Sequence, residues 1–371
     1  MAIKGNTIIP AFKQNNIVII LSSSDEFSIY LGVCIKSILL YASNQYNYDI
    51  IVLEREIADI NKSNILKMIQ DKRNVSIRFF NVTETMKGLN FYLNSTRLSQ
   101  ETYYGLLAPY VLSNFKRAII MDCDMIAKHD LADLYFDDLG DKIIGGVNDI
   151  VLQGWLNDRQ MNDTYYYYID YLRITDPYKC FNGGLVLLDF EKYRDYVNVA
   201  TIVEYINKYQ LRVVDQDIFN ILLEGKSKLI DFRWNHMICE GEVIEKAIND
   251  APEDVRAAFQ QSRKAPYIIH YAGDHKPWNN PFVEFGNDFW EVARQTAFYE
   301  RILYKMVNKE VNDSILRHQA VHTAGLIRRV FNPYRINKLK NIVKLIFPVG
   351  TKRYYALRRM YFAIRGKTYR E

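Results

Sequence analysis

Short apolar runs separated by amphipathic segments follow one another through the first half of the chain. Apolar runs of about four to eight residues are typical of buried strands, so we expect strands at residues 16–21, 50–53, 75–80, 118–121, 143–147 and 184–189. Between the early strands, apolar residues recur at helical spacing, so we expect helices at residues 29–41, 57–70 and 103–112. This alternation predicts an α/β fold, with a mostly parallel sheet and helices on both faces.

Residues 149–179 interrupt the alternation. The stretch is rich in aromatic residues and has four consecutive tyrosines at 165–168. It is too long for an ordinary connection, which suggests a lid or a recognition loop. Tyrosine runs can equally pack inside helices, and the sequence leaves both interpretations open.

Two carboxylates follow the apolar run at residues 118–121. Asp122 and Asp124 are separated by one residue, and alternate side chains of an extended segment point to the same side. At the C-terminal end of a strand, where open α/β sheets bind ligands, such a pair would make a hard-oxygen site for Mn²⁺ or Mg²⁺. A metal-bridged diphosphate is the natural ligand. Asp is also common in the turns at strand ends, so the pair alone leaves a structural role open.

Two later polar stretches are weak signals when taken singly. Residues 180–184 read Cys-Phe-Asn-Gly-Gly, and paired glycines permit either a close approach of the backbone to a ligand or a tight turn. Residues 214–218 read Val-Asp-Gln-Asp-Ile at an expected helix start, where Asp is often only a cap.

The stretch 268–281 is more specific. His270 follows an apolar run, as the Asp pair does, and could supply a nitrogen ligand to the same metal. Gly273 could bring a backbone N–H onto a phosphate, with Lys276 as a point charge on it. A lone His at a strand end is more often structural, but the set His-x-x-Gly-x-x-Lys-Pro-Trp is far more specific than any of its members.

With these motifs in this order, the chain is similar to glycosyltransferase family 8, retaining transferases that include bacterial lipopolysaccharide galactosyl- and glucosyltransferases. The resemblance covers about residues 16–304, and residues 289–299 resemble the helix that closes the catalytic domain in such enzymes. It rests on Thr102-Tyr103-Tyr104, Asp122-Cys123-Asp124, Phe181-Asn182-Gly183-Gly184, Asp215-Gln216-Asp217 and His270-Tyr271-Ala272-Gly273 with Lys276-Pro277-Trp278. The family implies a GT-A fold that uses Mn²⁺, or Mg²⁺, and a UDP-sugar donor.

The resemblance also implies a role for individual residues. Asp122, Asp124 and His270 would ligate the metal, and Gly273 and Lys276 would hold the diphosphate. The implied catalytic residues beside the donor sugar are Asp149, Asp215 and Gln216. The other implied contacts to the donor are Leu21, Ser22, Cys123, Asn182 and Gly183.

The implied mechanism is unusual for a retaining enzyme. Retention normally suggests a carboxylate nucleophile close to the anomeric carbon. This family instead places an amide there, at the position of Gln216. Because an amide is a poor nucleophile, we favour a front-face displacement through an oxocarbenium-like ion pair, in which Gln216 stabilises positive charge on the sugar.

The chain departs from the family pattern at two positions. Gly105 stands where family members usually carry an Arg that reaches the donor, and Ser24 stands where many have Asp. If another basic residue replaces the Arg, Arg97 and Lys87 are the candidates just upstream.

Length and composition limit the number of domains and the cellular compartment that we expect. With 371 residues, 49% of them apolar, the chain can form one large or two ordinary domains. Its four cysteines are scattered without a Cys-x-x-Cys pair, which favours a reducing compartment over a disulfide framework or a zinc site. The first residues do not resemble a signal peptide and no apolar run approaches a membrane span, so we expect a cytoplasmic protein.

Charge is unevenly distributed along the chain. Of 48 basic and 43 acidic residues, residues 314–371 hold 14 basic residues and one acid, which leaves 34 basic and 42 acidic residues in 1–313. We therefore expect a GT-A catalytic domain at 1–313, with its core at 16–304, and a basic, aromatic, helical tail at 314–371. Residues 335–347 have the pattern of an interfacial helix, so we expect the tail to attach to the anionic inner face of a membrane.

Two other functions remain open from the sequence. An apolar strand ending in Asp-x-Asp also occurs in haloacid-dehalogenase-type phosphatases, but Met125 and Ile126 follow here where Thr or Val is usual, and the motif lies late in the chain. A catalytically weakened, transferase-like scaffold for glycan assembly is the second. The basic tail has no nucleic-acid motif beside it, so nucleic acid is not an expected partner.

Overall fold

The computed structural model describes residues 8–87, 100–158, 162–238 and 240–309. By its contacts the chain divides into two units, Met1–Leu303 and Tyr304–Glu371, and all the elements named here belong to the first. The expected tail, residues 314–371, lies outside the described residues, as does Arg97. Among the described residues, no helix has both the length and the apolar character needed to cross a membrane.

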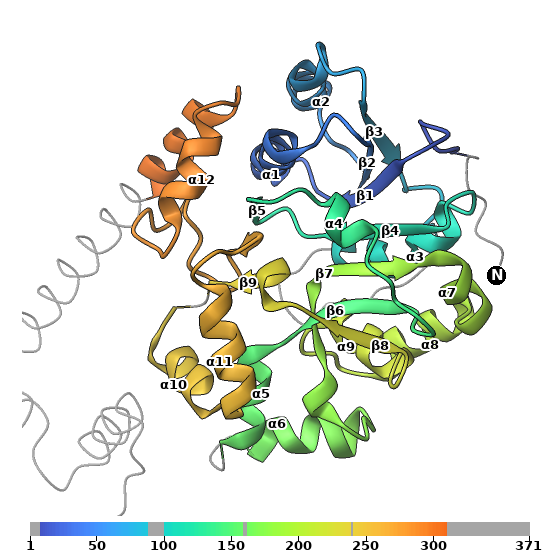
Figure 1. Ribbon diagram of the computed structural model, residues 1–371, viewed down its shortest axis with the longest axis vertical. Helices are drawn as coiled ribbons and strands as arrows, with labels where there is room; N and C mark the ends of the chain where they lie inside the picture. The colour runs from blue at the N-terminus through green and yellow to red at the C-terminus, as the bar shows by residue number, and fades with distance from the viewer. Residues whose placement is uncertain (1–7, 88–99, 159–161, 239, 310–371) are drawn as a thin grey trace, which may run out of the picture. The chain divides into compact units, whose positions relative to one another are not determined.

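A seven-stranded sheet forms the centre of this unit (Figure 1). Its strands are β1 (Asn16–Ser22), β2 (Asn47–Glu54), β3 (Val75–Asn81), β4 (Arg117–Met121), β6 (Ile144–Asn148), β7 (Phe181–Asp189) and β8 (Ser227–Ile230). They lie in the order β3-β2-β1-β4-β7-β6-β8, and all neighbours are parallel except that β7 runs antiparallel to β4 and to β6. The predicted α/β fold with a mostly parallel sheet is confirmed, and all six expected strands are present.

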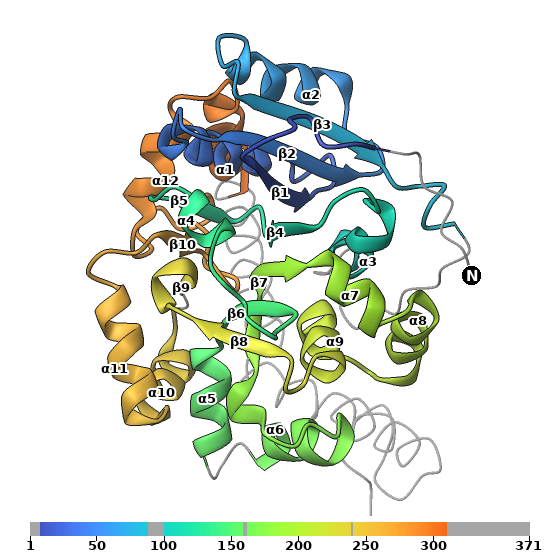
Figure 2. The same ribbon diagram turned by 45° about the vertical axis from the view of Figure 1, so that its right-hand side comes forward.

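Helices pack around the sheet, as Figure 2 shows from a second angle. They are α1 (Ser28–Tyr41), α2 (Asp59–Leu66), α3 (Tyr104–Val111), α4 (Ala132–Tyr135), α5 (Ile150–Asn157), α6 (Asn162–Tyr166), α7 (Phe190–Tyr196), α8 (Val199–Lys208), α9 (Val214–Leu222), α10 (Glu242–Asp250), α11 (Glu253–Ser262) and α12 (Gly286–Ala293). The expected helices at 29–41 and 103–112 correspond to α1 and α3. The one expected at 57–70 is α2 followed by a 3₁₀ turn, Lys67–Ile69.

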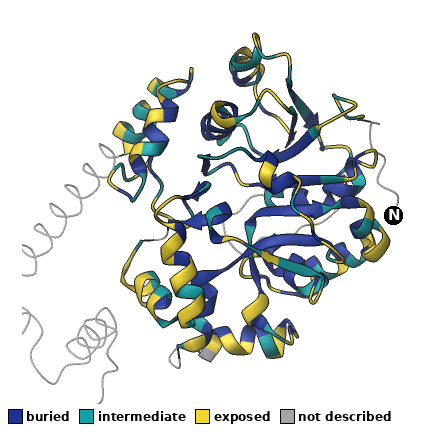
Figure 3. Ribbon diagram, viewed as in Figure 1, coloured by how far each residue is buried: buried dark blue, intermediate teal, exposed yellow. Residues whose placement is uncertain are grey.

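Strand β2 shows that both faces of the sheet are covered. All its residues after Asn47 are buried (Figure 3). Successive side chains of a strand point to opposite faces of the sheet. On one face, the Tyr48 hydroxyl donates to Asp130, which lies between β5 (Met125–Ala127) and α4. On the other, the carboxylate of Asp49 receives hydrogen bonds from the guanidinium of Arg78 at 2.6–3.1 Å. A buried carboxylate is tolerated here because it is paired and hydrogen-bonded.

The tyrosine-rich stretch is mostly helical rather than an open loop. It contains α5, α6, a π-helical turn Tyr167–Tyr171 and a 3₁₀ turn Pro177–Lys179. The tyrosines differ in their roles: Tyr167 and Tyr168 are buried, whereas Tyr165 and Tyr166 are exposed. Packing therefore accounts for the buried half of the run.

A second, three-stranded sheet places the motif that contains His270 beside the Asp122-Cys123-Asp124 motif. Its strands are β5, β10 (Ile268–His270) and β9 (His236–Met237), in the order β5-β10-β9. Strand β10 is antiparallel to β5 and pairs His270 with Met125. The Tyr271 amide donates to the carbonyl of Asp124 at 3.1 Å, which fixes the two motifs side by side.

The segment after β10 is anchored by aromatic packing. The Trp278 ring stacks on Tyr30 of α1, with centroids 4.0 Å apart, and lies 5.1 Å from the ring of Phe289 in α12. A Cβ on Gly32 of α1 would lie 2.2 Å from the Phe298 ring, so α1 and the segment after α12 pack closely. Residues 289–299 therefore close over α1.

Candidate metal and donor site

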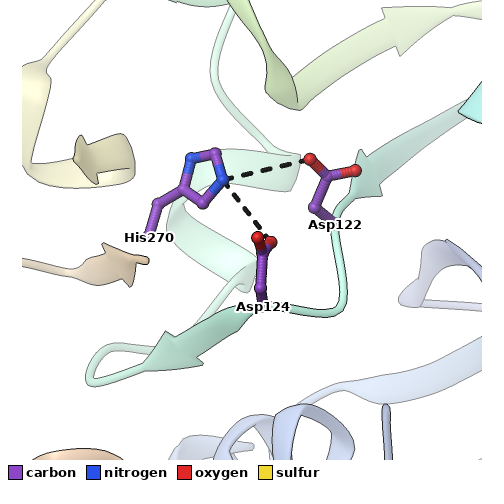
Figure 4. A group of neighbouring side chains, drawn as sticks. All are labelled: Asp122, Asp124 and His270. Carbon is purple, nitrogen blue, oxygen red and sulfur yellow. Dashed lines mark ion pairs between the residues drawn. The ribbon is translucent and has the colours of Figure 1, made fainter. Parts of the chain in front are cut away.

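Asp122, Asp124 and His270 converge at one point, as Figure 4 shows. Asp122 directly follows β4, Asp124 directly precedes β5, and His270 ends β10. His270 Nε2 lies 3.4 Å from Asp124 Oδ1 and 3.9 Å from Asp122 Oδ2, and one ligand atom from each residue lies within 4.8 Å of the others. Two carboxylates and an imidazole are a suitable ligand set for Mn²⁺.

One oxygen of this group lacks the partner that burial demands. Asp124 Oδ1 is buried and has no hydrogen-bond partner among the described residues, although it faces His270 Nε2. An unpaired buried carboxylate oxygen is costly, and a divalent cation would satisfy it. The residues therefore fit a metal ion.

The two carboxylates differ in their electrostatics. Burial raises the pKa of Asp124, but the Lys276 ammonium group beside it opposes this and holds that pKa well below its usual range. Lys276 Nζ donates to Asp124 Oδ2 and to the carbonyl of Tyr271. Removal of water by the surrounding protein, followed by repulsion from the Asp124 carboxylate, raises the pKa of Asp122 to about 7. The Asp122 side chain is nevertheless 57% exposed, so water moderates that shift.

A network of side-chain amides begins at the metal ligand. His270 Nδ1 lies 2.9 Å from Asn235 Oδ1, and Asn235 Nδ2 donates to Asn182 Oδ1 at 2.9 Å. Asn182 Nδ2 then donates to Gln216 Oε1 at 3.1 Å and to Asp149 Oδ2 at 3.3 Å. Gln216 Nε2 donates to the same Asp149 oxygen at 3.0 Å. Four predicted site residues and Asn235 thus share one network.

Asp149 and Gln216 are held firmly at the far end of the network. Asp149 caps α5, where its Oδ1 accepts from the amides of Val151 and Leu152 at 3.1 and 3.0 Å. Gln216 is 3% exposed, and its Oε1 also accepts from the Gly183 amide at 2.9 Å. In this conformation the Gln216 oxygen already receives two hydrogen bonds, so it offers no spare lone pair to a ligand.

The paired glycines let strand β7 pass close to these groups. A Cβ on Gly184 would lie 2.5 Å from His270 Cε1 and 3.0 Å from Asp122 Oδ2. A Cβ on Gly183 would lie 3.0 Å from Gln216 Cβ. The pair is therefore required by close packing of the site, which the sequence could not distinguish from a tight turn.

The first turn of α9 supplies two further carboxylates. Burial raises the pKa of Asp215 to about 7, against hydrogen bonds from its own amide and that of Gln216. Asp215 also lies near enough to Asp122 to raise the pKa of the latter. Asp217 is fully buried and accepts from the hydroxyls of Tyr167 and Tyr168 at 2.6 and 3.2 Å. Asp217 therefore ties the tyrosine-rich stretch to the helix that carries Gln216.

The predicted nucleotide contacts occupy neighbouring strand ends. Leu21 and Ser22 end β1, whose register places Leu21 beside Met121 of β4. Cys123 follows β4, and its thiol contacts the carbonyl of Ser22 at 3.2 Å. Gly273 has φ +77°, a left-handed conformation that favours glycine, and a Cβ there would have open space around it.

The two departures from the family pattern have clear structural settings. Gly105 is buried in α3, where a Cβ would lie 3.2 Å from the Ile120 methyl of β4. Ser24 lies before α1, where its hydroxyl accepts from the Phe27 amide at 3.4 Å. Lys87, one candidate for a replacement cation, is exposed and pairs with Glu84.

Asn235 is a member of the site that the sequence did not reveal. It ends a 3₁₀ turn, Phe232–Asn235, directly before β9, and it is 1% exposed. A single Asn within Phe-Arg-Trp-Asn-His resembles no motif, so the only signal was its position before a short strand.

Residues 18–281, well over half of the chain, match the Glycosyl transferase family 8. The protein belongs to glycosyltransferase family 8. General stress protein A of Bacillus subtilis (strain 168) is 25% identical over 275 residues, which are 72% of this chain and 90% of that protein. Glycosyltransferase GlyF of Streptococcus pneumoniae serotype 4 (strain ATCC BAA-334 / TIGR4) is 24% identical over 289 residues, 76% of this chain and 62% of GlyF.

Solved structures agree with this assignment. The bifunctional glycosyltransferase WbbM, in its apo form, superposes with a TM-score of 0.73 at 26% identity over 81% of this chain and 53% of WbbM. The galactosyltransferase LgtC, in complex with donor and acceptor sugar analogs, gives a TM-score of 0.62 at 22% identity over 76% of this chain and 96% of LgtC. These likenesses confirm the GT-A fold. This chain spans about half the length of WbbM.

Proposed function

We propose that this glycosyltransferase is a retaining, metal-dependent enzyme that moves a hexose from a UDP-sugar to a glycan or a lipid-linked acceptor. Cell-surface polysaccharide or lipopolysaccharide assembly is the setting we propose. The observation that carries the proposal is the convergence of Asp122, Asp124 and His270 around an unsatisfied buried carboxylate oxygen. Family membership leaves the phosphatase interpretation without support.

The proposed metal ligands and the groups beside them would suit the diphosphate of a UDP-sugar. Asp122, Asp124 and His270 would hold Mn²⁺, or Mg²⁺, which when bound supplies positive charge against the charge that develops on a departing UDP. Lys276 now pairs with Asp124, and its ammonium group lies at the same site. In the proposed complex Lys276 donates to a phosphate oxygen and Gly273 offers its backbone N–H, so both favour departure of the diphosphate.

The donor sugar would lie by Asp149, Asn182, Asp215 and Gln216. Gln216 is an amide and cannot act as a strong nucleophile, which supports front-face displacement through an oxocarbenium-like ion pair. Because Gln216 Oε1 already accepts from Asn182 and Gly183, it would have to exchange one of these bonds before it could stabilise the sugar. An NMR assignment of the first product tests retention: an α-configured donor should give an α-linkage, and a β-linkage would refute it.

The donor itself is tested by a direct screen. Purified protein with Mn²⁺ is incubated with each common UDP-sugar in turn, and slow release of UDP is measured. We expect release from one or a few hexose donors. No release from any UDP-sugar, with or without added acceptor glycans, would favour a transferase-like scaffold.

We further propose that residues 314–371 hold the enzyme at the cytoplasmic face of an anionic membrane, next to a lipid-linked acceptor. This rests on the sequence, with 14 basic residues against one acid in the tail. The full chain should sediment with anionic vesicles at low salt and be released at high salt. A chain ending at Asn312 should remain unbound yet still hydrolyse donor. Equal vesicle binding by that truncation would show that the tail is not the anchor.

A further inference from the structure

Backbone N–H groups fix the orientation of the side-chain amides that lead to His270. The Gly184 amide donates to Asn182 Oδ1 at 3.0 Å, and the Gly183 amide donates to Gln216 Oε1 at 2.9 Å. A backbone N–H can only donate, and the carboxylate of Asp149 can only accept. These fixed groups leave the amide of Asn182 one favourable orientation, with its oxygen toward Gly184 and its nitrogen toward Gln216 and Asp149.

This orientation is passed on to the metal ligand through Asn235. Because Asn182 presents its oxygen, Asn235 must turn its nitrogen toward Asn182, which places its own oxygen 2.9 Å from His270 Nδ1. An amide oxygen facing a ring nitrogen requires that nitrogen to carry the proton. The neutral His270 ring therefore has its proton on Nδ1 and a free lone pair on Nε2, the atom that faces Asp124 and Asp122.

We infer that Asn235 is a positioning residue that fixes the His270 tautomer for metal binding and couples the metal site to the donor-sugar residues. This inference rests on the proposed function for the identity of the metal and the sugar. Groups that bind the second nitrogen of a metal-ligating His commonly set its tautomer and orientation. Here the same side chain also bonds Asn182, so the metal ligand and Gln216 are held by one continuous network.

Asn220 provides a matched comparison within the same structure. Like Asn235 it is an almost fully buried Asn, with 5% of its surface exposed against 1%. Among the described residues, its amide bonds only backbone groups: the Phe181 amide at 3.0 Å, the Phe181 carbonyl at 2.9 Å and the Gln216 carbonyl at 2.9 Å. A purely structural buried Asn would be expected to bond the backbone in this way, whereas the two bonds of Asn235 reach His270 and Asn182.

Two substitutions separate the effect of the hydrogen bond between Asn235 and His270 from that of the bond between Asn235 and Asn182. Asn235→Leu removes both hydrogen bonds and keeps a similar size. Asn235→Asp keeps an acceptor for His270 Nδ1 but loses the donor to Asn182. Asn220→Leu is the control for loss of a buried amide, and Asn235→Ala replaces the leucine variant if that one does not fold.

The primary measurement is the tautomer of His270 in the metal-free protein, read from long-range ¹H–¹⁵N spectra of ¹⁵N-His-labelled chain, with His270→Gln to assign the signal. The wild type, Asn235→Asp and Asn220→Leu should show the proton on Nδ1. Asn235→Leu should show a mixed or reversed tautomer and should weaken Mn²⁺ binding by about 10–100-fold in calorimetry. Asn235→Asp should keep Mn²⁺ binding but lower kcat more than it changes KM for the donor.

The outcomes distinguish this inference from the proposed function. An unchanged tautomer and unchanged Mn²⁺ affinity in Asn235→Leu would overturn it, as would an equal tautomer change in Asn220→Leu. If the wild type bound no Mn²⁺, the proposed metal dependence would fail, while the spectra would still decide whether Asn235 sets the tautomer.

Discussion

Replacing Gln216 by Glu tests the electrostatics of the donor-sugar end of the site. In the wild type, Gln216 Nε2 donates to Asp149 Oδ2 at 3.0 Å, and the two residues are only 3% and 8% exposed. Gln216→Glu turns this hydrogen bond into two facing carboxylates. The introduced group can either stay charged beside Asp149 or take up a proton and donate it to the same oxygen.

The magnitudes decide which response dominates at each pH. Two like charges 3.0 Å apart repel by about 5 kcal/mol at an effective dielectric constant of about 20. With an ordinary Glu pKa of about 4.3 and about 1.36 kcal/mol per unit, keeping the proton costs about 1 kcal/mol at pH 5 and about 4 kcal/mol at pH 7.5. Proton uptake is therefore the cheaper response at pH 5, and the two responses become comparable at pH 7.5.

The expected result is a pH-dependent loss of stability. The introduced carboxyl has a higher pKa in the folded than in the unfolded chain, so its contribution to stability falls as pH rises above about 4.3. A difference of about 3 kcal/mol between pH 5 and pH 7.5 corresponds to a melting temperature lower by roughly 4–5 °C at the higher pH, relative to wild type.

Thermal melts of wild type and variant at both pH values are the assay. Adding Asp149→Asn to Gln216→Glu removes the second charge and should shrink the pH dependence, because less of the repulsion remains. An equal melting difference between variant and wild type at pH 5 and pH 7.5 would refute the reasoning, since it would mean that Gln216 and Asp149 do not face each other.

Three further predictions concern neighbouring positions. Gly184→Ala should weaken Mn²⁺ binding by roughly tenfold or more in calorimetry, because its Cβ would lie 2.5 Å from His270 Cε1; unchanged affinity would contradict the close approach. Asp215→Asn should flatten the fall in thermal stability between about pH 4 and pH 7, because the raised pKa of Asp215 means that the folded chain keeps a proton there which the unfolded chain has released; a slope equal to wild type would count against a raised pKa of Asp215 in the folded chain. Gly105→Arg should lower the melting temperature, because its Cβ would lie 3.2 Å from the methyl group of Ile120 in a buried position, and tighter UDP-sugar binding at unchanged stability would instead place position 105 in the donor site.

The main strands and helices could be predicted because their patterns are long. Strand β1 has five consecutive buried apolar positions followed by a polar turn, and α1 keeps helical spacing over fourteen residues. The direction of β7 could not be predicted, since its apolar run Gly184–Leu188 reads the same whether the strand runs parallel or antiparallel. Direction depends on the path of the preceding connection, which local periodicity does not contain.

The short second sheet could not be predicted from the pattern of apolar and polar residues. Strands β5 and β10 have three residues each and β9 has two, too few for any periodicity to be recognised. Its existence nevertheless decides the site, because pairing of β10 with β5 brings His270 beside the Asp pair. From the sequence, His270 could be offered as a ligand to the same metal because it also follows an apolar run, but the strand pairing that puts it beside the Asp pair could not be predicted.

The residues of the candidate site also differ in whether they could be predicted from the local sequence. Asp122 and Asp124 could be found from one strand end, because their chemistry is local to that strand. Asn235 could not, because its role consists of hydrogen bonds to residues 35 positions later and 53 positions earlier in the chain. Asp217 likewise reads as a helix cap in sequence, whereas in the structure it also holds two tyrosines about fifty residues upstream.

The central claim is that Asp122, Asp124 and His270 hold a metal on which sugar transfer depends. The most direct test measures UDP release from the preferred UDP-sugar with Mn²⁺, in excess chelator, and with Asp124→Asn. Asp141→Asn is the control, since that carboxylate is 80% exposed and pairs only with Lys142 in the ion pairs of the described residues. Release should be lost in chelator, should fall by orders of magnitude in Asp124→Asn, and should be unchanged in Asp141→Asn. Full activity of the wild type in excess chelator would contradict the account.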